Sequence, residues 1–197
     1  MPTLSERVPL PVQAAALRAA FGLPRRARRR LAGRPVRIDG QELALDAQLL
    51  LRMLAVSGTT LAGSRDPVAA RAQLDASAAM VADRTLPDVA TRNVRIPTAT
   101  GTIAARLYIP ARVERPAPLL VYYHGGGFAI GSLDTHDNTA RFFAVYAGVR
   151  VLSVDYRLAP ENPFPAGCDD ALAAFDFAHA NAEELGCDPL RIAVGGD

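Results

Sequence analysis

Apolar positions recur at helical spacing along the first 90 residues of the chain. Two alanine- and leucine-rich stretches show this period, one over residues 43–54 and the other over residues 68–80. The segment from Gly58 to Pro67 has the composition of a loop between two helices. The pattern therefore predicts a helical region over residues 1–90.

The period shortens to two residues from about residue 92. Apolar residues alternate with polar or small ones over 94–96 and 103–109, with a turn between them, as in half-buried antiparallel strands. The pattern further predicts strands over 119–123, over 149–156 and from residue 192, separated by helices over 136–147 and 169–185. This order of strands and helices predicts an α/β fold whose second half is a parallel sheet flanked by helices.

The helix predicted over residues 169–185 carries apolar side chains at helical spacing. Asp169 and Asp170 stand in its first turn, where negative charge suits the helix dipole. The residues expected to face the core are Leu172, Phe175, Ala178, Ala182 and Leu185. Gly186 is expected to end the helix.

Composition indicates one ordinary domain with a small accessory region. Half of the 197 residues are hydrophobic, which is enough to form a core. Cys168 and Cys187 fall outside any CxxC pattern, and the N-terminal residues do not resemble a secretory signal. No apolar run reaches the roughly 18 residues of a membrane span. These features predict a cytoplasmic protein with reduced thiols and no transmembrane segment.

The balance of charge argues against a polyanion-binding protein, because the formal net charge is only +2. The charge is uneven, however, since seven arginines lie between Arg25 and Arg37. Such a cluster could contact nucleic acid or an anionic membrane surface. No aromatic residues are interleaved with it as stacking platforms, so we favour a solvated helix face and expect no nucleic-acid partner.

Three adjacent glycines, Gly125, Gly126 and Gly127, follow the apolar run 119–123 and His124. Each glycine costs roughly 0.5–1 kcal/mol relative to alanine in regular structure, so the backbone there must meet some other requirement. A turn of this kind after a strand can aim two backbone N–H donors at one developing negative charge. The stretch therefore indicates a loop that stabilises the oxyanion of an acyl-transfer reaction.

Three motifs in the right order resemble the hormone-sensitive-lipase-like branch of the α/β-hydrolases, a family of esterases and lipases. They are His124–Phe128, the run from Asp155 to Pro165, and the pair Gly196–Asp197 after an apolar strand. The resemblance covers residues 92–197. It implies the N-terminal part of an α/β-hydrolase sheet, with antiparallel first strands and then a parallel βαβ series. It also implies a helical cap over residues 1–90 and an incomplete hydrolase core over residues 91–197.

The resemblance implies a carboxylic-ester hydrolase that attacks a small-molecule acyl ester with a serine nucleophile, without a metal or cofactor. The family prefers short to medium acyl chains. Gly126 and Gly127 would donate their N–H groups to the oxyanion, while Gly125 would permit the turn. His124 would hold the loop through its ring, a structural role that we favour over proton transfer.

Gly196 and Asp197 match the first two positions of the family's Gly-Asp-Ser-Ala-Gly elbow. The serine would be the next residue, and the acid and base of the triad follow later in chain order. None of the triad is therefore expected within these 197 residues, which the resemblance implies are an N-terminal fragment ending just before the nucleophile. Asp155 and Arg157 could look catalytic, but the resemblance implies a buried structural pair, and a carboxylate at the end of a strand needs a partner if it is buried.

Two other functions compete with this interpretation. A dinucleotide-binding module also has a glycine-rich turn after a strand and an acidic residue at the end of the next strand, here Asp155. The glycines fit GxGxxG in no register, which argues against it. The other competitor is a non-catalytic protein that keeps half of the hydrolase fold as an interaction surface. Truncation would leave the strand from residue 192 as an exposed edge, so self-association is expected.

The 197-residue chain by itself is expected to show no turnover of an activated ester such as a nitrophenyl acyl ester. Without a nucleophile and a base it has no covalent route to hydrolysis. Release of nitrophenol, followed by absorbance, measures this directly. Turnover that a serine-directed phosphonate inhibits would contradict the expectation.

Overall fold

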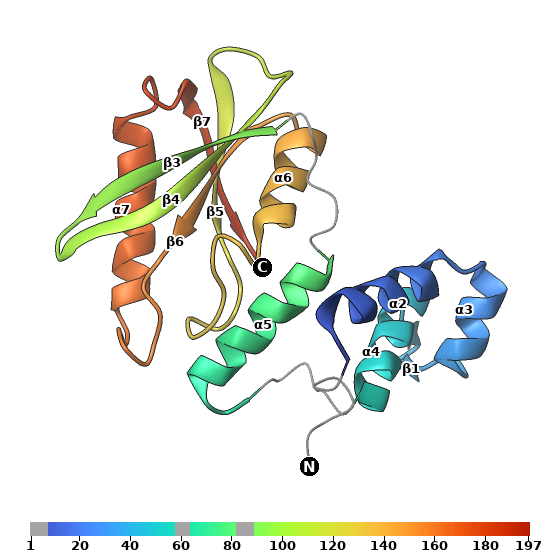
Figure 1. The fold of residues 1–197 in the computed structure, drawn as a ribbon. Helices are drawn as coiled ribbons and strands as arrows, with labels where there is room; N and C mark the ends of the chain where they lie inside the picture. Colours follow the sequence, from blue (N-terminus) through green and yellow to red (C-terminus); the bar gives the residue numbers. More distant parts are fainter. Residues whose placement is uncertain (1–7, 58–63, 82–88) are drawn as a thin grey trace. The chain divides into compact units, whose positions relative to one another are not determined.

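The computed structural model of the protein describes residues 8–57, 64–81 and 89–197 (Figure 1). The chain forms two compact units, residues 1–65 and residues 66–197. The sequence pattern places the boundary between the two regions at residue 90, whereas the compact units divide after residue 65. Helix α5 (Pro67–Val81) lies between these two positions and belongs to the second unit. Most of the loop predicted over 58–67 lies outside the described residues.

Helices dominate the first unit, as its periodicity predicts. Its elements are α2 (Leu10–Gly22), α3 (Arg25–Ala32), α4 (Leu45–Ser57) and the antiparallel pair β1 (Arg37–Ile38) and β2 (Gln41–Glu42). The buried side chain of Gln48 on α4 donates from Nε2 to the carbonyls of Ala32, at 2.9 Å, and Arg34, at 2.6 Å. Because a buried amide needs such partners, Gln48 fixes the path of the chain after α3.

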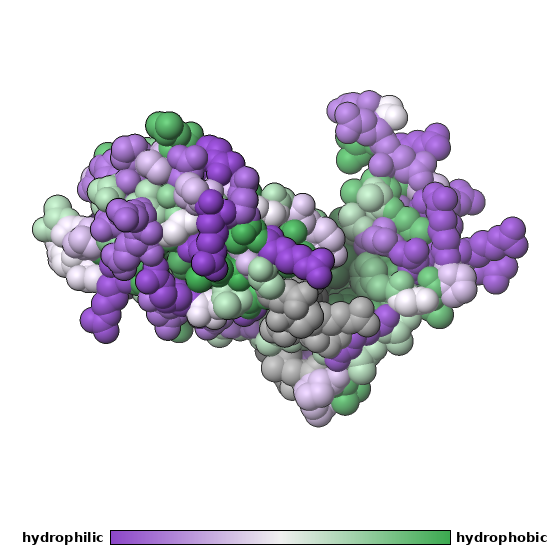
Figure 2. Space-filling model, turned by 90° about the horizontal axis from the view of Figure 1, so that it is seen from above, coloured by the Kyte–Doolittle hydropathy of each residue, from purple (hydrophilic) through white to green (hydrophobic). Residues whose placement is uncertain are grey.

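Three arginines of the cationic cluster have carboxylate partners within the first unit. Arg28 pairs with Asp46 of α4. Glu42 of β2 accepts from Arg29 and from Arg37, each at 3.0 Å. Four further members are exposed: Arg25, Arg26, Arg30 and Arg34. Figure 2 shows long hydrophilic side chains over the segment where α3 lies. Surface ion pairs contribute only about 0–1 kcal/mol each to stability. The main effect of this pairing is therefore to neutralise part of the positive charge of the cluster.

A five-stranded mixed sheet organises the second unit (Figure 1). Besides α5, the elements are β3 (Val89–Thr98), β4 (Gly101–Pro110), β5 (Ala117–Tyr123), α6 (Asp137–Tyr146), β6 (Arg150–Asp155), α7 (Ala166–Ala180) and β7 (Cys187–Gly196). The strand order is β3-β4-β6-β5-β7, in which β3, β4 and β6 pair antiparallel and β5 pairs parallel with β6 and β7. This confirms the predicted α/β class, with antiparallel first strands followed by a parallel βαβ series.

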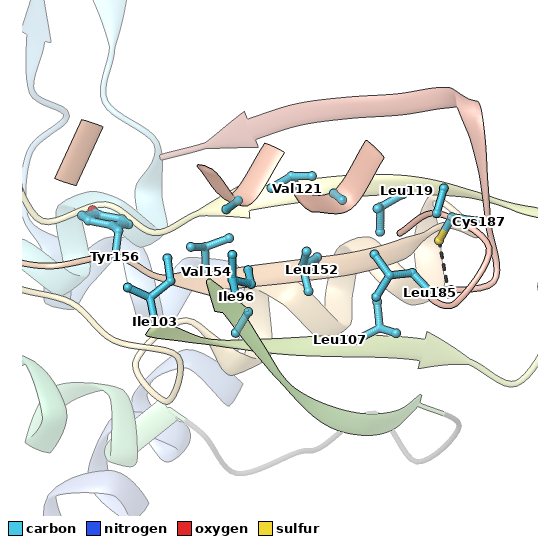
Figure 3. Packing of buried hydrophobic residues seen from close by; sticks show 14 residues of the cluster. Ile96, Ile103, Leu107, Leu119, Val121, Leu152, Val154, Tyr156, Leu185 and Cys187 are labelled. Carbon is cyan, nitrogen blue, oxygen red and sulfur yellow. Dashed lines mark hydrogen bonds between the residues drawn. The ribbon is translucent and has the colours of Figure 1, made fainter. Parts of the chain in front are cut away.

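Alternation of side chains along the strands gives the sheet two apolar faces. One face packs against α7, and its cluster includes Ile96, Leu107, Leu119, Val121, Leu152, Val154, Ala174 and Ala178 (Figure 3). The other face packs against α6 through Tyr108, Tyr122, Val151, Ala140 and Ala144. Burying one leucine or valine side chain contributes about 1.5–3 kcal/mol, so the two faces supply most of the stability of this unit.

Helix α7 differs from the helix predicted over residues 169–185. It ends at Ala180, so the predicted end at Gly186 is wrong. Leu172, which was expected in the core, is 63% exposed. The buried positions of α7 are Gly167, Asp170, Ala174 and Ala178. Small side chains three or four residues apart form the face that approaches the sheet, because they let the helix backbone lie close to it.

The ion pair predicted between Asp155 and Arg157 does not form. Arg157 instead holds the fully buried Asp170, with Nε and Nη2 each 2.8 Å from a carboxylate oxygen. The backbone N–H of Arg157 donates to the same carboxylate at 2.9 Å. Burial raises the pKa of Asp155, which has no ion pair with Arg157. The Arg157–Asp170 pair therefore ties the loop after β6 to α7.

The sequence predicts no transmembrane segment and no disulfide. Within the described residues, no helix is long and apolar enough to cross a membrane. Cys168 is exposed, Cys187 is buried, and both are free thiols. Burial raises the pKa of the Cys187 thiol, which favours its neutral form.

Replacing Asp170 by alanine is expected to destabilise the second unit by about 2–3 kcal/mol, because three N–H donors of Arg157 lose their charged acceptor. Equilibrium unfolding in urea, followed by circular dichroism, measures this free energy. Asp169→Ala is the matched control, since its exposed neighbouring carboxylate should change stability by only about 0.5 kcal/mol. Equal effects of the two substitutions would contradict the structural role of Asp170.

Candidate functional site

The glycine triplet and the pair Gly196–Asp197 meet at one edge of the sheet. β5 ends at Tyr123 and β7 ends at Gly196, and these two residues are partners in the parallel ladder. The carboxyl ends of parallel strands lie at the same edge, which is where open α/β sheets bind ligands. Two motifs that are far apart in the sequence therefore form one site.

The loop after β5 requires glycine at two positions for steric reasons. Gly126 has φ +121°, and a Cβ there would lie 2.1 Å from the carbonyl oxygen of Ile130. Gly131 has φ +102°, and a Cβ there would lie 2.3 Å from Nδ1 of His124. Only glycine tolerates these backbone angles and contacts. The loop is therefore a tight turn in which backbone lies against backbone.

The N–H groups of the triplet differ in what they bind. The N–H of Gly125 donates to Oδ1 of Asp197 at 2.9 Å. Within the described part of the chain, the N–H groups of Gly126 and Gly127 donate to no protein acceptor. The carbonyl of Gly126 faces the other way and accepts from the N–H groups of Ala129 and Ile130, each at 3.2 Å. The loop thus leaves two adjacent backbone donors available to a ligand.

Asp197 holds the start of this loop through its carboxylate. Oδ1 accepts from the hydroxyl of Tyr122 at 2.6 Å and from the N–H of Gly125 at 2.9 Å. Oδ2 lies 3.4 Å from Nε2 of His136. Burial disfavours the charged carboxylate, but the hydrogen bonds from Tyr122 and Gly125 outweigh burial and lower the pKa of Asp197. Asp197 is therefore ionised at neutral pH and fixes Gly125.

The ring of His124 is packed inside the site. Its Nδ1 lies 2.9 Å from the carbonyl oxygen of Gly125, and its ring stacks on Tyr156 with centroids 4.4 Å apart. Burial is the main reason that the pKa of His124 is lowered, so the ring is neutral at pH 7. Nδ1 then carries the proton that it donates to Gly125. The hydroxyl of Tyr156 donates to the carbonyl of His124 at 2.5 Å, which fixes the same segment from the other side.

From the sequence, no role in the site was assigned to several residues that the structure places there. Tyr122, His136 and Tyr156 surround the glycine loop, and Arg71 of α5 donates to the carbonyl of Ala129. Each is an ordinary residue in its own element, and only the fold brings it to the loop. Among the described residues, no three His, Cys, Asp or Glu side chains gather closely enough to hold a metal ion.

Comparisons with known proteins agree with this geometry. Residues 120–197 match a family described as having the alpha/beta hydrolase fold. The carboxylic ester hydrolase LipN of Mycobacterium tuberculosis is 47% identical over 171 residues, which are 84% of this chain and 44% of LipN. The carboxylesterase NlhH of the same organism is 58% identical over 95 residues, which are 48% of this chain and 30% of NlhH.

Solved structures give the same result. An esterase from Pyrobaculum calidifontis superposes with a TM-score of 0.66 at 40% identity, over 75% of this chain and 46% of the esterase. The thermophilic carboxylesterase EstE1 superposes with a TM-score of 0.63 at 43% identity, over 70% of this chain and 46% of EstE1. The chain spans less than half the length of each of these relatives. Sequence, fold and loop geometry agree: residues 120–197 match the alpha/beta hydrolase family model, and the second unit has the alpha/beta hydrolase fold.

Proposed function

We propose that this chain supplies the oxyanion-binding part of a carboxylic-ester hydrolase, with Gly126 and Gly127 as the two backbone donors. The observation that carries the proposal is their pair of adjacent N–H groups, which have no acceptor in the described residues. Residues 120–197, which contain this loop, match the alpha/beta hydrolase family model, and two relatives named as a carboxylic ester hydrolase and a carboxylesterase are 47% and 58% identical to the chain over the parts that match. His124 and Gly125 are positioning residues in this proposal, since they hold the loop and touch no substrate.

The chemistry follows from two adjacent N–H groups that have no acceptor in the described residues. A carbonyl oxygen of an acyl ester bound at Gly126 and Gly127 becomes an oxyanion when a nucleophile adds to the carbonyl carbon. Preorganised N–H groups stabilise that charge without reorganising, and one such donor is worth roughly 10²- to 10³-fold in rate. A serine that followed Asp197 in the complete gene product would emerge at the end of β7, beside the loop after β5. The nucleophile and the donors would then share one edge of the sheet.

The exposed edge of β7 supports a second proposal, that the chain self-associates along this strand. Within the described residues β7 pairs only with β5, so its other edge has unpaired backbone groups. Two of its apolar side chains, Leu190 and Val194, are 90% and 59% exposed. An exposed apolar edge strand is a template for pairing with another copy.

Activity of the complete product of the gene tests the oxyanion proposal. It should hydrolyse a nitrophenyl butyrate, and Gly126→Ala should lower kcat roughly 10²- to 10³-fold, because the new Cβ collides with Ile130 and turns the donor away. Gly127→Ala is the control. Its Cβ meets open space, so only backbone strain of about 1–2 kcal/mol remains. The proposal fails if there is no ester hydrolysis, or if Gly126→Ala leaves kcat unchanged.

Sedimentation velocity tests the self-association of the 197-residue chain. The wild-type chain should sediment as dimers or larger species, whereas Val194→Lys should shift it toward monomer, because a charge on an edge strand opposes pairing. Leu172→Lys is the control, since Leu172 is equally exposed apolar surface but lies on α7. A wild-type chain that stays monomeric and unfolds cooperatively would refute the proposal.

A further inference from the structure

Arg71 on α5 makes four hydrogen bonds to two loops that follow β5 and β6. Nε donates to the carbonyl of Ala129 at 2.8 Å, and Nη2 donates to the carbonyl of Ala159 at 2.8 Å. Nη1 and Nη2 also donate to the two carboxylate oxygens of Glu161, at 2.9 and 2.7 Å. One guanidinium therefore joins three segments that are far apart in the sequence.

The contact with Ala129 reaches the oxyanion loop through the backbone. The carbonyl of Ala129 accepts from Arg71, while its own N–H donates to the carbonyl of Gly126 at 3.2 Å. The peptide group of Gly126 is thus held on its carbonyl side by a residue that Arg71 anchors. A shift of Ala129 would change the orientation of the neighbouring N–H of Gly127, because the same planar peptide unit carries the Gly126 carbonyl.

The loop after β6 completes this connection. The N–H of Ala159 donates to the carbonyl of Phe128 at 2.7 Å, and its carbonyl accepts from Arg71. Both groups of Ala159 are therefore used to hold the two loops together. Within the described residues, the side-chain hydrogen bonds between α5 and the loops of the sheet all come from Arg71.

Glu161 forms a close ion pair with Arg71, which favours the charged form of its carboxylate. The hydrogen bond from Arg71 is the largest of the influences that lower the pKa of Glu161, to about 2. The contribution of the pair is therefore fully present above the ordinary carboxyl pKa of 4.5 and is lost as the pH falls toward 2. A planar guanidinium can bind a carboxylate with two N–H groups and still offer a third to a carbonyl, which a lysine ammonium cannot do in the same geometry.

We propose that Arg71 is a positioning residue that locks the oxyanion loop of Gly126 and Gly127 against the loop after β6, so that the orientation of the Gly127 N–H group depends on α5. The oxyanion role of these glycines rests on the proposed function, whereas the locking itself does not require it. Arg71 acts on the loop through the backbone of Ala129 and, by way of Ala159, through Phe128, and it makes no hydrogen bond to Gly126 or Gly127 themselves.

Amide hydrogen exchange on the full chain, measured by mass spectrometry, tests the locking. Peptides over 125–131 and 157–163 contain the bonded amides of Ala129, Ile130 and Ala159. Arg71→Met should speed their exchange roughly ten- to a hundredfold, while a peptide over β6 stays unchanged. Arg92→Met is the matched control, because Arg92 forms a looser exposed ion pair with Glu184, at 3.6 Å, in the same unit.

Two further variants separate bridging from charge and keep the test valid if Arg71→Met unfolds the chain. Arg71→Lys should fail to restore protection in the two loops, because it cannot bond Ala129, Ala159 and Glu161 together. Glu161→Gln should loosen residues 157–163 more than residues 125–131, since the bond from Nε to Ala129 remains. Full protection in Arg71→Lys, or unchanged loop exchange in Arg71→Met, would overturn the proposal.

Titration of the Glu161 carboxyl by carbon NMR gives an independent readout. In the wild-type chain it should titrate near pH 2, and in Arg71→Lys it should titrate nearer to its ordinary value of 4.5. An unchanged titration would show that Arg71 does not hold this loop, and so would count against the proposal. These measurements need no turnover, so they stand apart from the outcome of the ester-hydrolysis assay.

Discussion

The parallel pairing of β5 with both of its neighbours decides where the rest of the second unit lies. Tyr123, at the end of β5, is in register with Val154 of β6 and with Gly196 of β7. Because all three strands run the same way, the loops that follow them emerge at one edge. The glycine triplet, the loop held by Arg157, and Asp197 become neighbours for this reason alone. A slip of one residue in this register would turn the apolar side chains of β5 to the wrong faces.

Local patterns predicted the strands well because the signal for a strand is itself local. Alternation along residues 94–109 reports which side of the sheet each residue faces, and the turn at Gly101 joins the two strands as expected. The prediction of α7 was weaker for a physical reason. The predicted stripe included Ala178, which is buried, but it missed Gly167, Asp170 and Ala174, because small residues and a carboxylate give little hydrophobic signal. Leu172 was placed in the core because of its helical spacing and is solvent-exposed.

The part of the site that depends on local sequence was also predictable. The glycines were recognisable because a tight turn excludes other residues, and the structure gives the steric cause at Gly126. The partners of the loop were not, since Asp197 and Arg71 reach it from opposite directions across 72 and 58 residues of sequence. Asp155 was paired with the wrong residue because Asp170 offers a buried carboxylate from α7, which no nearby sequence reveals. What could not be predicted was thus long-range pairing, whereas the need for glycine in this turn could be read from the sequence.

The bonds of Arg71 also decide where the polypeptide can be divided. A boundary at residue 65 keeps α5 and its guanidinium with the loops that they contact, whereas a boundary at residue 90 removes the donor of four hydrogen bonds. Helix α5 therefore belongs with the sheet, and a segment exchanged between relatives should end before α5 begins. A chimera that joins the N-terminal helices of a relative to the sheet of this chain would therefore have its joint before Pro67, a boundary that helical periodicity alone does not mark.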